Sequence, residues 1–444
     1  MRNIKLALTA VLLALLLLWW LGDPAADTLP ANWLGWRNLL VQATGVLAIG
    51  AMSLALVLAL RPVALEPWLG GLDKMYRLHK WLGIAALAAA IAHWLLANGP
   101  KWLVGAGLVE RPQRGARPAL PEGSLQQALA QWRGLAEDMG EWAFYAAVVL
   151  IVLALWKRFP YRTFLRTHRW LGLAYLVLAF HSVVLLTYAA WAGVLGSALG
   201  AMLLAGSFAA VRALLRRVGV DRRVVGEIAK VIRHDARDVV ELVVALQGRW
   251  PGHAAGQFAF LTLDRKEGAH PFTITSAWAG DGRIDFVIKG IGDYTRTLRD
   301  RVHVGDPVVV EGPYGRFDFE SSAGRQVWIG AGVGITPFIA RMKALAMKPD
   351  GRRIDLFHPT ATLDPHAIAL IERDAAAAGV ALHVLWDERD GRLDAARLAA
   401  AVPDWRDADV WFCGPAPFGR ALRHDLEAMG LPAGRFHQEL FEMR

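Results

Sequence analysis

The chain of 444 residues has almost no cysteine, since Cys413 is the only one. One cysteine cannot form a disulfide within the chain, and it cannot supply all the thiolates of an iron–sulfur cluster. The sequence also lacks the C-x-x-C-H pattern of covalently attached haem and the EF-hand pattern of a calcium loop. Any haem would therefore be held without thioether bonds, and direct gating by calcium is not expected.

Acidic residues are in short supply as well. The sequence has 40 Asp and Glu against 49 Lys and Arg, which gives a net charge of +9. A basic excess is compatible with nucleic-acid binding, but here the basic residues gather beside apolar stretches, as the positive-inside rule describes for membrane proteins. We therefore expect this chain to be surrounded by membrane lipid, with no nucleic-acid partner.

Long apolar stretches are abundant in the first half of the chain, and 55% of all residues are hydrophobic. A stretch needs about 17–25 residues to span a bilayer as a helix, and the fourth stretch only just qualifies. The first could be a secretory signal peptide, but its length and the Trp19–Trp20 end favour a retained span. The six expected spans are 5–22, 38–60, 80–97, 141–156, 169–190 and 193–214.

Charge in the loops predicts the orientation. Positive residues are dense in segments 61–80, 157–169 and 212–223, which the positive-inside rule places in the cytoplasm together with both termini. The outer loop 99–140 also carries Arg111, Arg114 and Arg117, so the bias is incomplete, and an amphipathic helix is expected near 125–136. The predicted localisation is a multi-pass protein of a membrane such as the bacterial inner membrane, with the second half cytoplasmic.

Four histidines lie within or beside the apolar stretches, where ionisable residues are usually functional. His79 and His93 are 14 positions apart, about 21 Å along a helix and within about 40° of the same face. His168 and His181 are 13 positions apart, which leaves them about 140° apart in an ideal straight helix. His168 lies at the expected helix start, where a tighter or irregular turn is plausible, so the pairing is a firmer prediction than its exact geometry.

This arrangement predicts two haem irons, one between His79 and His168 and one between His93 and His181. The alternative is that the four histidines are hydrogen-bonding links between helices. Tyr175 lies between His168 and His181 in the sequence, and we expect it to be a packed aromatic residue rather than a group between the haems.

The second half has the pattern of two further folds. Short alternating strands are expected at 224–231, 239–245, 257–263, 272–276, 283–289 and 307–312, which is typical of a small antiparallel barrel. From about residue 325, strands and helices alternate, which indicates a parallel sheet with crossover helices.

Two motifs in the barrel region suit a flavin. HPFTITS (270–276) places hydroxyl groups on a strand, where one could lie near the flavin N5. VIKGIGDYTRTL (287–298) ends a strand in glycines and opens a helix at about Asp293. Free N–H groups at a helix start suit a diphosphate, although Asp293 is also an ordinary helix cap.

Two motifs in the last part suit a nicotinamide dinucleotide. GAGVGITPF (330–338) follows an apolar strand at 326–329 and precedes a helix through 340–347, where glycines allow a pyrophosphate to approach closely. Its spacing is not G-x-G-x-x-G, and no acidic residue stands out at the ribose position. FCGPAPF (412–418) again joins a strand to a helix, and Cys413 is expected to contact the nicotinamide, the alternative being a small buried apolar residue.

Together these residues resemble the ferric reductase and NADPH oxidase superfamily over nearly the whole chain. The histidine spacings match its bis-histidine pattern for two b-type haems, HPFTITS its flavin motif, GAGVGITPF its NADPH-pyrophosphate motif and FCGP its nicotinamide motif. The resemblance implies a multidomain membrane protein: a six-helix transmembrane haem bundle (1–217), an antiparallel β-barrel FAD domain (218–321) and an α/β parallel-sheet domain binding NAD(P)H (322–444).

The resemblance also implies which residues hold the cofactors. FAD would contact His270, Pro271, Phe272, Thr273 and Ser276, and its ribityl-diphosphate portion Lys289, Gly292 and Thr295. NADPH, or NADH, would contact Gly330, Gly332, Gly334, Thr336 and Pro337, and its nicotinamide Cys413, Gly414 and Pro415. The residues expected nearest the reacting rings are Thr273, Cys413 and Phe441, an aromatic near the C-terminus that would cover the flavin.

Two departures from the superfamily pattern bear on function. Ala97 stands where animal NADPH oxidases have a further histidine near the oxygen site, which puts a dedicated superoxide site in doubt. The sequence HPTATLDP after the strand 354–357 lacks the arginine that commonly reads the NADPH phosphate, so His358, Thr360, Arg389 or Arg392 would have to serve. NADPH is favoured over NADH.

The resulting hypothesis is an enzyme that passes electrons from cytoplasmic NAD(P)H through FAD and two haems to an outer acceptor, either a ferric chelate or O2. One alternative is a membrane subunit that donates electrons to a protein partner, whose identity the sequence leaves unknown. Another is a flavin reductase with a membrane anchor that has no haem.

Overall fold

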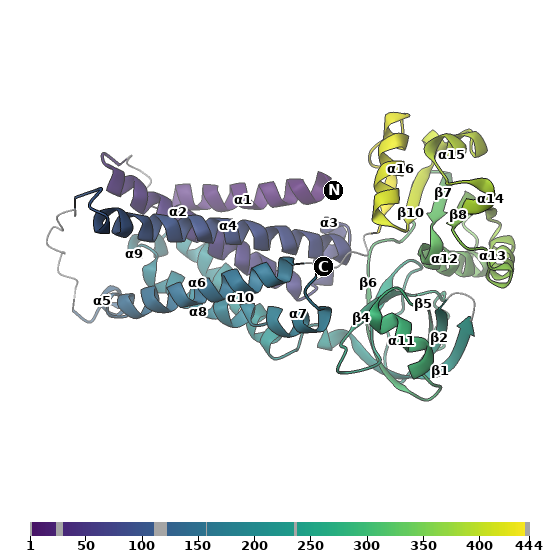
Figure 1. Cartoon of the computed structure of the whole chain (residues 1–444), viewed down its shortest axis with the longest axis horizontal. Helices are drawn as coiled ribbons and strands as arrows, with labels where there is room; N and C mark the ends of the chain where they lie inside the picture. Colours follow the sequence, from purple (N-terminus) through teal and green to yellow (C-terminus); the bar gives the residue numbers. More distant parts are fainter. Residues whose placement is uncertain (1, 24–29, 111–121, 157, 235–237, 440–444) are drawn as a thin grey trace. The chain divides into compact units, whose positions relative to one another are not determined.

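The computed structural model describes residues 2–23, 30–110, 122–156, 158–234 and 238–439 (Figure 1). The chain divides into two compact units: Met1–Pro62 with Lys74–Val218, and Val63–Asp73 with Gly219–Arg444. The first unit is helical, and the second contains two sheets together with the short link that precedes helix α4. The predicted boundary between the barrel and nucleotide domains lies within the second unit and stays a prediction.

The first unit confirms the prediction of six apolar helices within the described residues. Most are longer than predicted, and the fourth is not marginal, because α6 starts at Arg133 and has 23 residues. An exposed ion pair one turn apart, between Arg133 Nε and Glu137 Oε1 at 3.0 Å, lies in the first turns of this helix, before its apolar part. The six are α1 (Arg2–Gly22), α2 (Trp33–Ala59), α4 (Leu72–Gly105), α6 (Arg133–Leu155), α7 with α8 (Tyr161–His168, Leu171–Leu185) and α10 (Val194–Leu214).

The amphipathic helix expected near 125–136 is divided. Helix α5 (Leu125–Gln131) begins at the cap Ser124, whose side chain accepts the N–H of Gln127, and it ends at Trp132, where α6 follows. The expected helix therefore forms a short separate turn and the start of a span.

A tightened turn, which the histidine spacing made plausible, lies between α7 and α8. Trp170 N donates to Thr167 O at 3.0 Å, and Gly172 N donates to Arg169 O at 2.9 Å, so these bonds link residues three positions apart as in a 3₁₀ turn. This turn separates His168 from the regular helix that contains His181, and the two need not keep the angle of an ideal helix.

Six antiparallel strands form the first sheet of the second unit, in the order β4-β3-β6-β1-β2-β5. An isolated bridge between Ile274 and Phe286 joins the two ends of this order, but no full ladder does, so a closed barrel stays a prediction. Strand β4 is shifted from the expected 272–276, because the chain leaves the ladder after Thr273. The strands are β1 (Arg223–His234), β2 (Val239–Leu246), β3 (Phe258–Thr262), β4 (His270–Thr273), β5 (Arg283–Lys289) and β6 (Pro307–Tyr314).

Five parallel strands form the second sheet, in the order β11-β10-β7-β8-β9, as predicted. They are β7 (Arg325–Gly330), β8 (Arg353–Thr360), β9 (Ala381–Trp386), β10 (Asp409–Cys413) and β11 (Phe436–Gln438). The chain runs from β7 outward to β9 on one side, then returns to β10 on the other. The order of strands therefore reverses between β7 and β10, which is where ligands bind in open parallel sheets.

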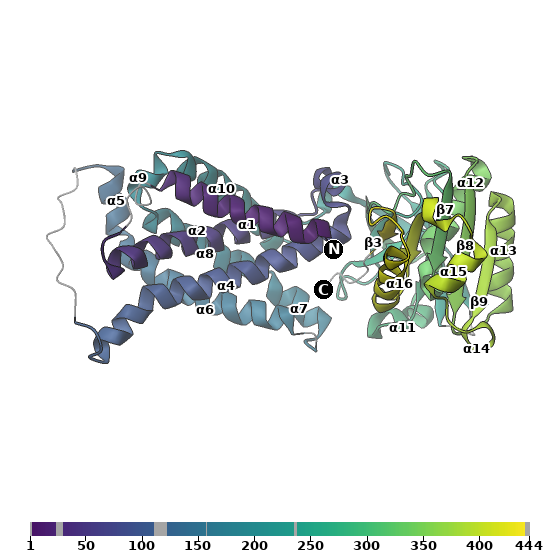
Figure 2. The same ribbon diagram turned by 90° about the horizontal axis from the view of Figure 1, so that it is seen from above.

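Helices cover both faces of this sheet because side chains alternate along each strand. Trp328 of β7 packs with α12 (Thr336–Met347) and α13 (Pro365–Ala378). Its neighbours Val327 and Ile329 pack with α15 (Ala395–Ala401) and α16 (Ala416–Ala428) on the other face (Figure 2).

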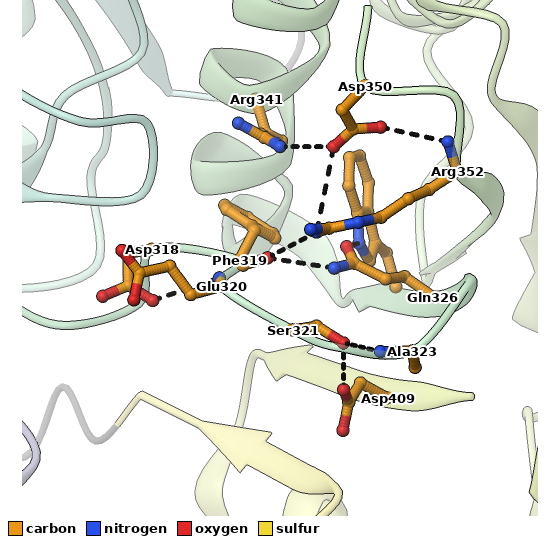
Figure 3. Close-up of polar contacts among 11 residues, drawn as sticks. Asp318, Phe319, Glu320, Ser321, Ala323, Gln326, Arg341, Asp350, Arg352 and Asp409 are labelled. Atoms are coloured by element: carbon orange, nitrogen blue, oxygen red, sulfur yellow. Dashed lines mark hydrogen bonds and ion pairs between the residues drawn. The ribbon is translucent and has the colours of Figure 1, made fainter. Parts of the chain in front are cut away.

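The segment between β6 and β7 is held through Phe319, whose φ of 59° is unusual for a residue with a Cβ. The Phe319 carbonyl accepts from Gln326 Nε2 at 3.0 Å and from an Arg352 guanidinium nitrogen at 3.1 Å (Figure 3). Its ring is fully buried and lies under the Arg341 guanidinium. These contacts fix the path by which the chain enters the parallel sheet.

Candidate functional site

The four histidines of the helical unit meet as the two predicted pairs. The ring centres of His79 and His168 are 6.0 Å apart, and those of His93 and His181 are 6.2 Å apart. Two imidazoles on opposite sides of one iron have ring centres roughly 6 Å apart, from about 2 Å per metal–nitrogen bond and about 1 Å within each ring. Both spacings therefore fit an iron between the rings.

Three of the four rings are oriented by backbone carbonyls. Nδ1–H of His79 donates to Ala55 O at 2.8 Å, that of His93 to Val41 O at 2.9 Å, and that of His181 to Ala136 O at 2.8 Å. Metal-binding histidines usually donate their second ring N–H in this way, which leaves the Nε2 lone pair for the metal. This pattern is compatible with metal ligands, and the same bonds link neighbouring helices, as the alternative interpretation expects.

Small residues make room for these contacts. One turn beyond each accepting carbonyl stands a small residue: Ala59, Gly45 and Gly140. A Cβ at Gly140 would overlap the His181 ring at Nδ1, and one at Gly45 would be 3.3 Å from the His93 ring. The helices thus approach the histidine rings at positions where larger side chains would not fit.

His168 differs from the other three. Its Nδ1 is buried and has no hydrogen-bond partner among the described residues. The described residues also contain no cluster of three or more His, Cys, Asp or Glu that could hold a metal ion. Two imidazoles cannot complete the coordination of an iron by themselves, whereas a haem brings four equatorial nitrogens. The donor set therefore fits a bis-histidine haem.

Tyr175 is a packed core residue, as predicted. Its side chain is fully buried in the helical core, and its hydroxyl lies 2.7 Å from Ser53 Oγ. This confirms the structural interpretation of Tyr175.

The flavin motif begins on β4. The His270 ring stacks on Tyr294 of α11 (Asp293–Arg301) with centres 4.5 Å apart, and burial lowers the pKa of His270. Pro271 and Phe272 are partly exposed, and Phe272 packs against the sheet core. Thr273 is buried at the end of the strand. His270 and Thr273 are thus the first and last residues of β4, and a contact of either with FAD stays a prediction.

Ser276 has a structural partner that the sequence did not indicate. Its hydroxyl accepts the N–H of Asp285 at 3.1 Å, and its carbonyl accepts from His253 Nε2 at 3.1 Å. Burial lowers the pKa of His253. Ser276 thus ties the end of the motif to β5, and a direct contact with FAD stays a prediction.

The predicted diphosphate segment forms a capped helix start. Thr295 Oγ1 accepts the N–H of Gly292 at 2.9 Å and that of Ile291 at 3.1 Å, and Gly292 is the cap of α11. Lys289 is exposed at the end of β5. Thr295 therefore caps the start of α11, and its contact with FAD stays a prediction.

The glycine motif lies at the strand-order reversal between β7 and β10. Gly332 has a φ of 57°, and a Cβ at Gly334 would overlap the carbonyl of Cys413. Thr336 Oγ1 donates to Val333 O at 3.1 Å, and Pro337 stands in the first turn of α12, both buried. The turn after β7 is therefore compact and closely approaches the turn after β10.

The second nucleotide motif, FCGPAPF (412–418), forms the turn after β10, which faces the glycine turn after β7. Ala331 N donates to Cys413 O at 2.9 Å, and a Cβ at Gly414 would be 2.7 Å from that of Ala331. Pro415 caps α16. Cys413 itself is fully buried, and burial raises the pKa of its thiol well above the ordinary value. Cys413 is thus a protonated interior thiol, and Phe441 lies outside the described residues.

The contacts of two buried polar residues were not predicted from the sequence. Glu66 accepts the N–H of Gly315 at 3.2 Å, although the two are 249 positions apart. His358 was considered only as a phosphate reader, but its Nδ1–H donates to Gly330 O at 2.7 Å beside the glycine turn. The Pro359 that follows His358 was the available signal, because a proline in a central strand leaves a carbonyl without its ladder partner.

Comparison with known families identifies both halves of the chain. Residues 44–179 match the model of the ferric reductase like transmembrane component, and residues 226–318 match an FAD-binding domain. His79, His93 and His168 lie within the first match, and His181 lies two residues beyond it. The resemblance found in the sequence is confirmed: a ferric-reductase-like transmembrane domain is joined to an FAD-binding reductase module, in a multi-pass membrane protein.

Individual relatives match part of the chain. The stachydrine N-demethylase reductase subunit of Rhizobium meliloti is 30% identical over 207 residues, covering 43% of this chain and 58% of the relative. The flavohemoprotein of Bordetella pertussis is 32% identical over 167 residues, covering 34% of this chain and 41% of the relative. The chain thus spans about half the length of these curated relatives.

Two solved structures are similar to this chain at low sequence identity. The flavohem-like FAD/NAD-binding domain of a nitric oxide dioxygenase from Vibrio cholerae has a TM-score of 0.43 and 23% identity, covering 49% of this chain and 97% of that one. Flavohemoglobin from Malassezia yamatoensis has a TM-score of 0.48 and 18% identity, covering 91% and 98%.

Proposed function

We propose that this membrane protein, with its ferric-reductase-like transmembrane domain and FAD-binding module, is an NAD(P)H-dependent flavocytochrome b oxidoreductase. In this proposal electrons pass from NAD(P)H through FAD and two b-type haems to an acceptor on the outer side of the membrane. The single observation that supports it most strongly is the pair of histidine spacings, 6.0 Å and 6.2 Å, within the ferric-reductase-like segment.

The histidines would bind the haems, and the redox chemistry would be that of the bound cofactors. His79 and His168 would hold one iron, and His93 and His181 the other. The carbonyls of Ala55, Val41 and Ala136 orient three of these rings and raise the basicity of their Nε2 atoms. The protein's part in this unit is therefore to position two pairs of ligands.

The soluble unit would bind the two other cofactors. The turn after β7 and the turn after β10 meet at the strand-order reversal, where a dinucleotide is expected to bind. Thr273 would face the flavin, Phe441 would cover it, and the buried Cys413 would line the nicotinamide side. Since Cys413 stays protonated, its role is to shape the site and not to react.

The proposed orientation follows from the charges. The basic segments 61–80, 157–169 and 212–223 would face the cytoplasm, with the FAD and nucleotide modules on the same side. The predicted environment is a bacterial inner membrane.

The acceptor would be a ferric chelate or O2. Ala97 at the position of an additional histidine favours the ferric chelate. A second candidate is supported by the relatives: two of them are named as reductase subunits, of a stachydrine N-demethylase and of a glycine betaine monooxygenase. In that case this chain would donate electrons to a protein partner.

Haem content of histidine variants tests the proposal. Wild-type protein is expected to contain two haems per chain, and His79→Ala or His168→Ala to lose the haem of that pair while NAD(P)H still reduces FAD. The control is His424→Ala, because His424 is exposed on α16. Two haems retained in either membrane variant would refute the ligand assignment, and protein without any haem would leave an anchored flavin reductase.

A further inference from the structure

The ladder between β7 and β8 stops one residue before the glycine turn begins. Its last pair of residues is Ile329 with Phe357. Gly330, the last residue of β7, belongs to no backbone ladder pair with β8. In a parallel ladder the next bond would run from the N–H of residue 359 to the carbonyl of Gly330. Residue 359 is a proline and has no N–H, so this bond cannot form.

A side chain supplies the donor in its place. His358 is 2% exposed, and its Nδ1–H donates to the Gly330 carbonyl at 2.7 Å. A buried carbonyl without a donor is unfavourable, so this bond replaces the missing one. Strand β8 still pairs with β9 beyond this point, through Pro359 with Leu385 and Thr360 with Trp386.

The bonded carbonyl lies at the start of the proposed nucleotide site. The residue after Gly330 is Ala331, whose N–H donates to Cys413 O at 2.9 Å, and Gly334 N donates to Ala331 O at 3.0 Å. A Cβ at Gly330 would be 2.9 Å from Ile335 Cα, so the turn folds back tightly on the strand end. The bond from His358 of β8 therefore fixes the start of the glycine turn after β7, and the bond to Cys413 of β10 fixes the turn on its other side.

We propose that His358 is a positioning residue for dinucleotide binding: its Nδ1–H replaces the backbone N–H absent from Pro359 and holds the 331–334 turn at the strand-order reversal. This inference rests on the proposed function, since it assigns NAD(P)H to that turn. His358 acts through the backbone and does not need to touch the dinucleotide.

Three variants separate this role from simple packing. His358→Leu removes the donor but keeps a buried side chain. His358→Asn keeps an N–H donor at the position of Nδ1. The double variant His358→Leu/Pro359→Ala restores a backbone N–H that can bond to Gly330 O.

NAD(P)H reduction of FAD is measured in FAD-loaded full-length protein in detergent, with ferricyanide as acceptor. His358→Leu is expected to raise KM for NAD(P)H about tenfold, which corresponds to a bond of about 1.4 kcal/mol, with kcat changed less than about twofold. His358→Asn and the double variant are expected to return KM to within about threefold of the wild-type value. An unchanged KM in His358→Leu, or an equal loss of kcat in all three variants, would overturn the proposal.

Amide hydrogen exchange without nucleotide gives an independent result. In His358→Leu, the N–H groups of Ala331 and Gly334 are expected to exchange faster than in the wild type, and the double variant is expected to restore their protection. Should wild-type protein fail to use NAD(P)H while this pattern holds, the proposed function fails and the positioning role of His358 stands. Unchanged exchange at both amides in His358→Leu would refute the positioning role itself.

Discussion

Glu66 should make the second unit less stable as the pH rises. Its carboxylate is 3% exposed and accepts the N–H of Gly315. Burial raises the pKa of Glu66 to about 7 from 4.5, although the Gly315 hydrogen bond and the charge of Arg222 act to lower it. A carboxyl group with a raised pKa binds its proton more tightly in the folded state, so its contribution is fully present below the unfolded pKa and is lost as pH rises through 7.

The magnitude follows from these two pKa values. The ionisable Glu66 lowers the free energy of unfolding by about 1 kcal/mol at pH 5 and about 3 kcal/mol at pH 8, relative to a neutral side chain. Glu66→Gln cannot ionise, and its amide oxygen can still accept from Gly315. The variant should therefore gain about 2 kcal/mol over the wild type between pH 5 and pH 8.

Thermal unfolding of the full-length protein in detergent, followed at pH 5 and pH 8, measures this difference. For a domain of 150–250 residues, 1 kcal/mol shifts Tm by about 2–4 °C, so the variant should gain about 4–8 °C more at pH 8 than at pH 5. Glu372→Gln is the matched control, because Glu372 is an exposed glutamate of α13. A Tm difference between Glu66→Gln and wild type that is the same at both pH values would refute the reasoning.

Three further predictions concern single contacts. Gly140→Ala should displace the His181 ring and reduce haem content by one per chain, whereas Gly134→Ala, in open space on the same helix, should not. Gly334→Ala should separate the turn after β7 from the turn after β10 and lower the rate of FAD reduction by NAD(P)H at least tenfold. Gly324→Ala is the control, because its added methyl group meets open space. Equal rates in Gly334→Ala and wild type would contradict a role for the close contact between Gly334 and Cys413. Burial alone would raise the pKa of Asp355, but hydrogen bonds from His383 and Arg325 hold it below the ordinary value of 3.8. Asp355→Asn should therefore destabilise the protein at pH 7, and by progressively less below about pH 4. Acid unfolding measures this, and a difference from wild type that stays constant with pH would refute it.

The sequence predicted the elements well where a local pattern determines them. Hydropathy located all six apolar helices, and alternation located strand β5 at Arg283–Lys289 to the residue. The 13-residue spacing made an irregular turn near His168 plausible, and the structure has a tightened turn directly after it. Hydropathy was a weaker guide to the ends of helices, because the first turns of α6 contain charged residues such as Arg133 and Glu137.

The candidate site was predictable in its residue types but not in its contacts. The histidine pairs follow from their spacing in the sequence. The hydrogen bond from His181 Nδ1–H to the carbonyl of Ala136, in contrast, depends on how α6 and α8 pack. Glu66 and Gly315 are far apart in sequence, and no local pattern links them. His358 could have been recognised from the proline beside it only once the neighbouring strand was known to be β7.

The central claim is that this chain connects a flavin to two haems held by histidine pairs. Anaerobic absorbance of purified, haem-supplied protein with FAD, before and after NADPH, tests it most directly. The account predicts a Soret band that shifts on NADPH addition, with sharp b-type α bands. A protein that shows no haem absorbance, or haem bands that NADPH does not change while FAD is reduced, would contradict it.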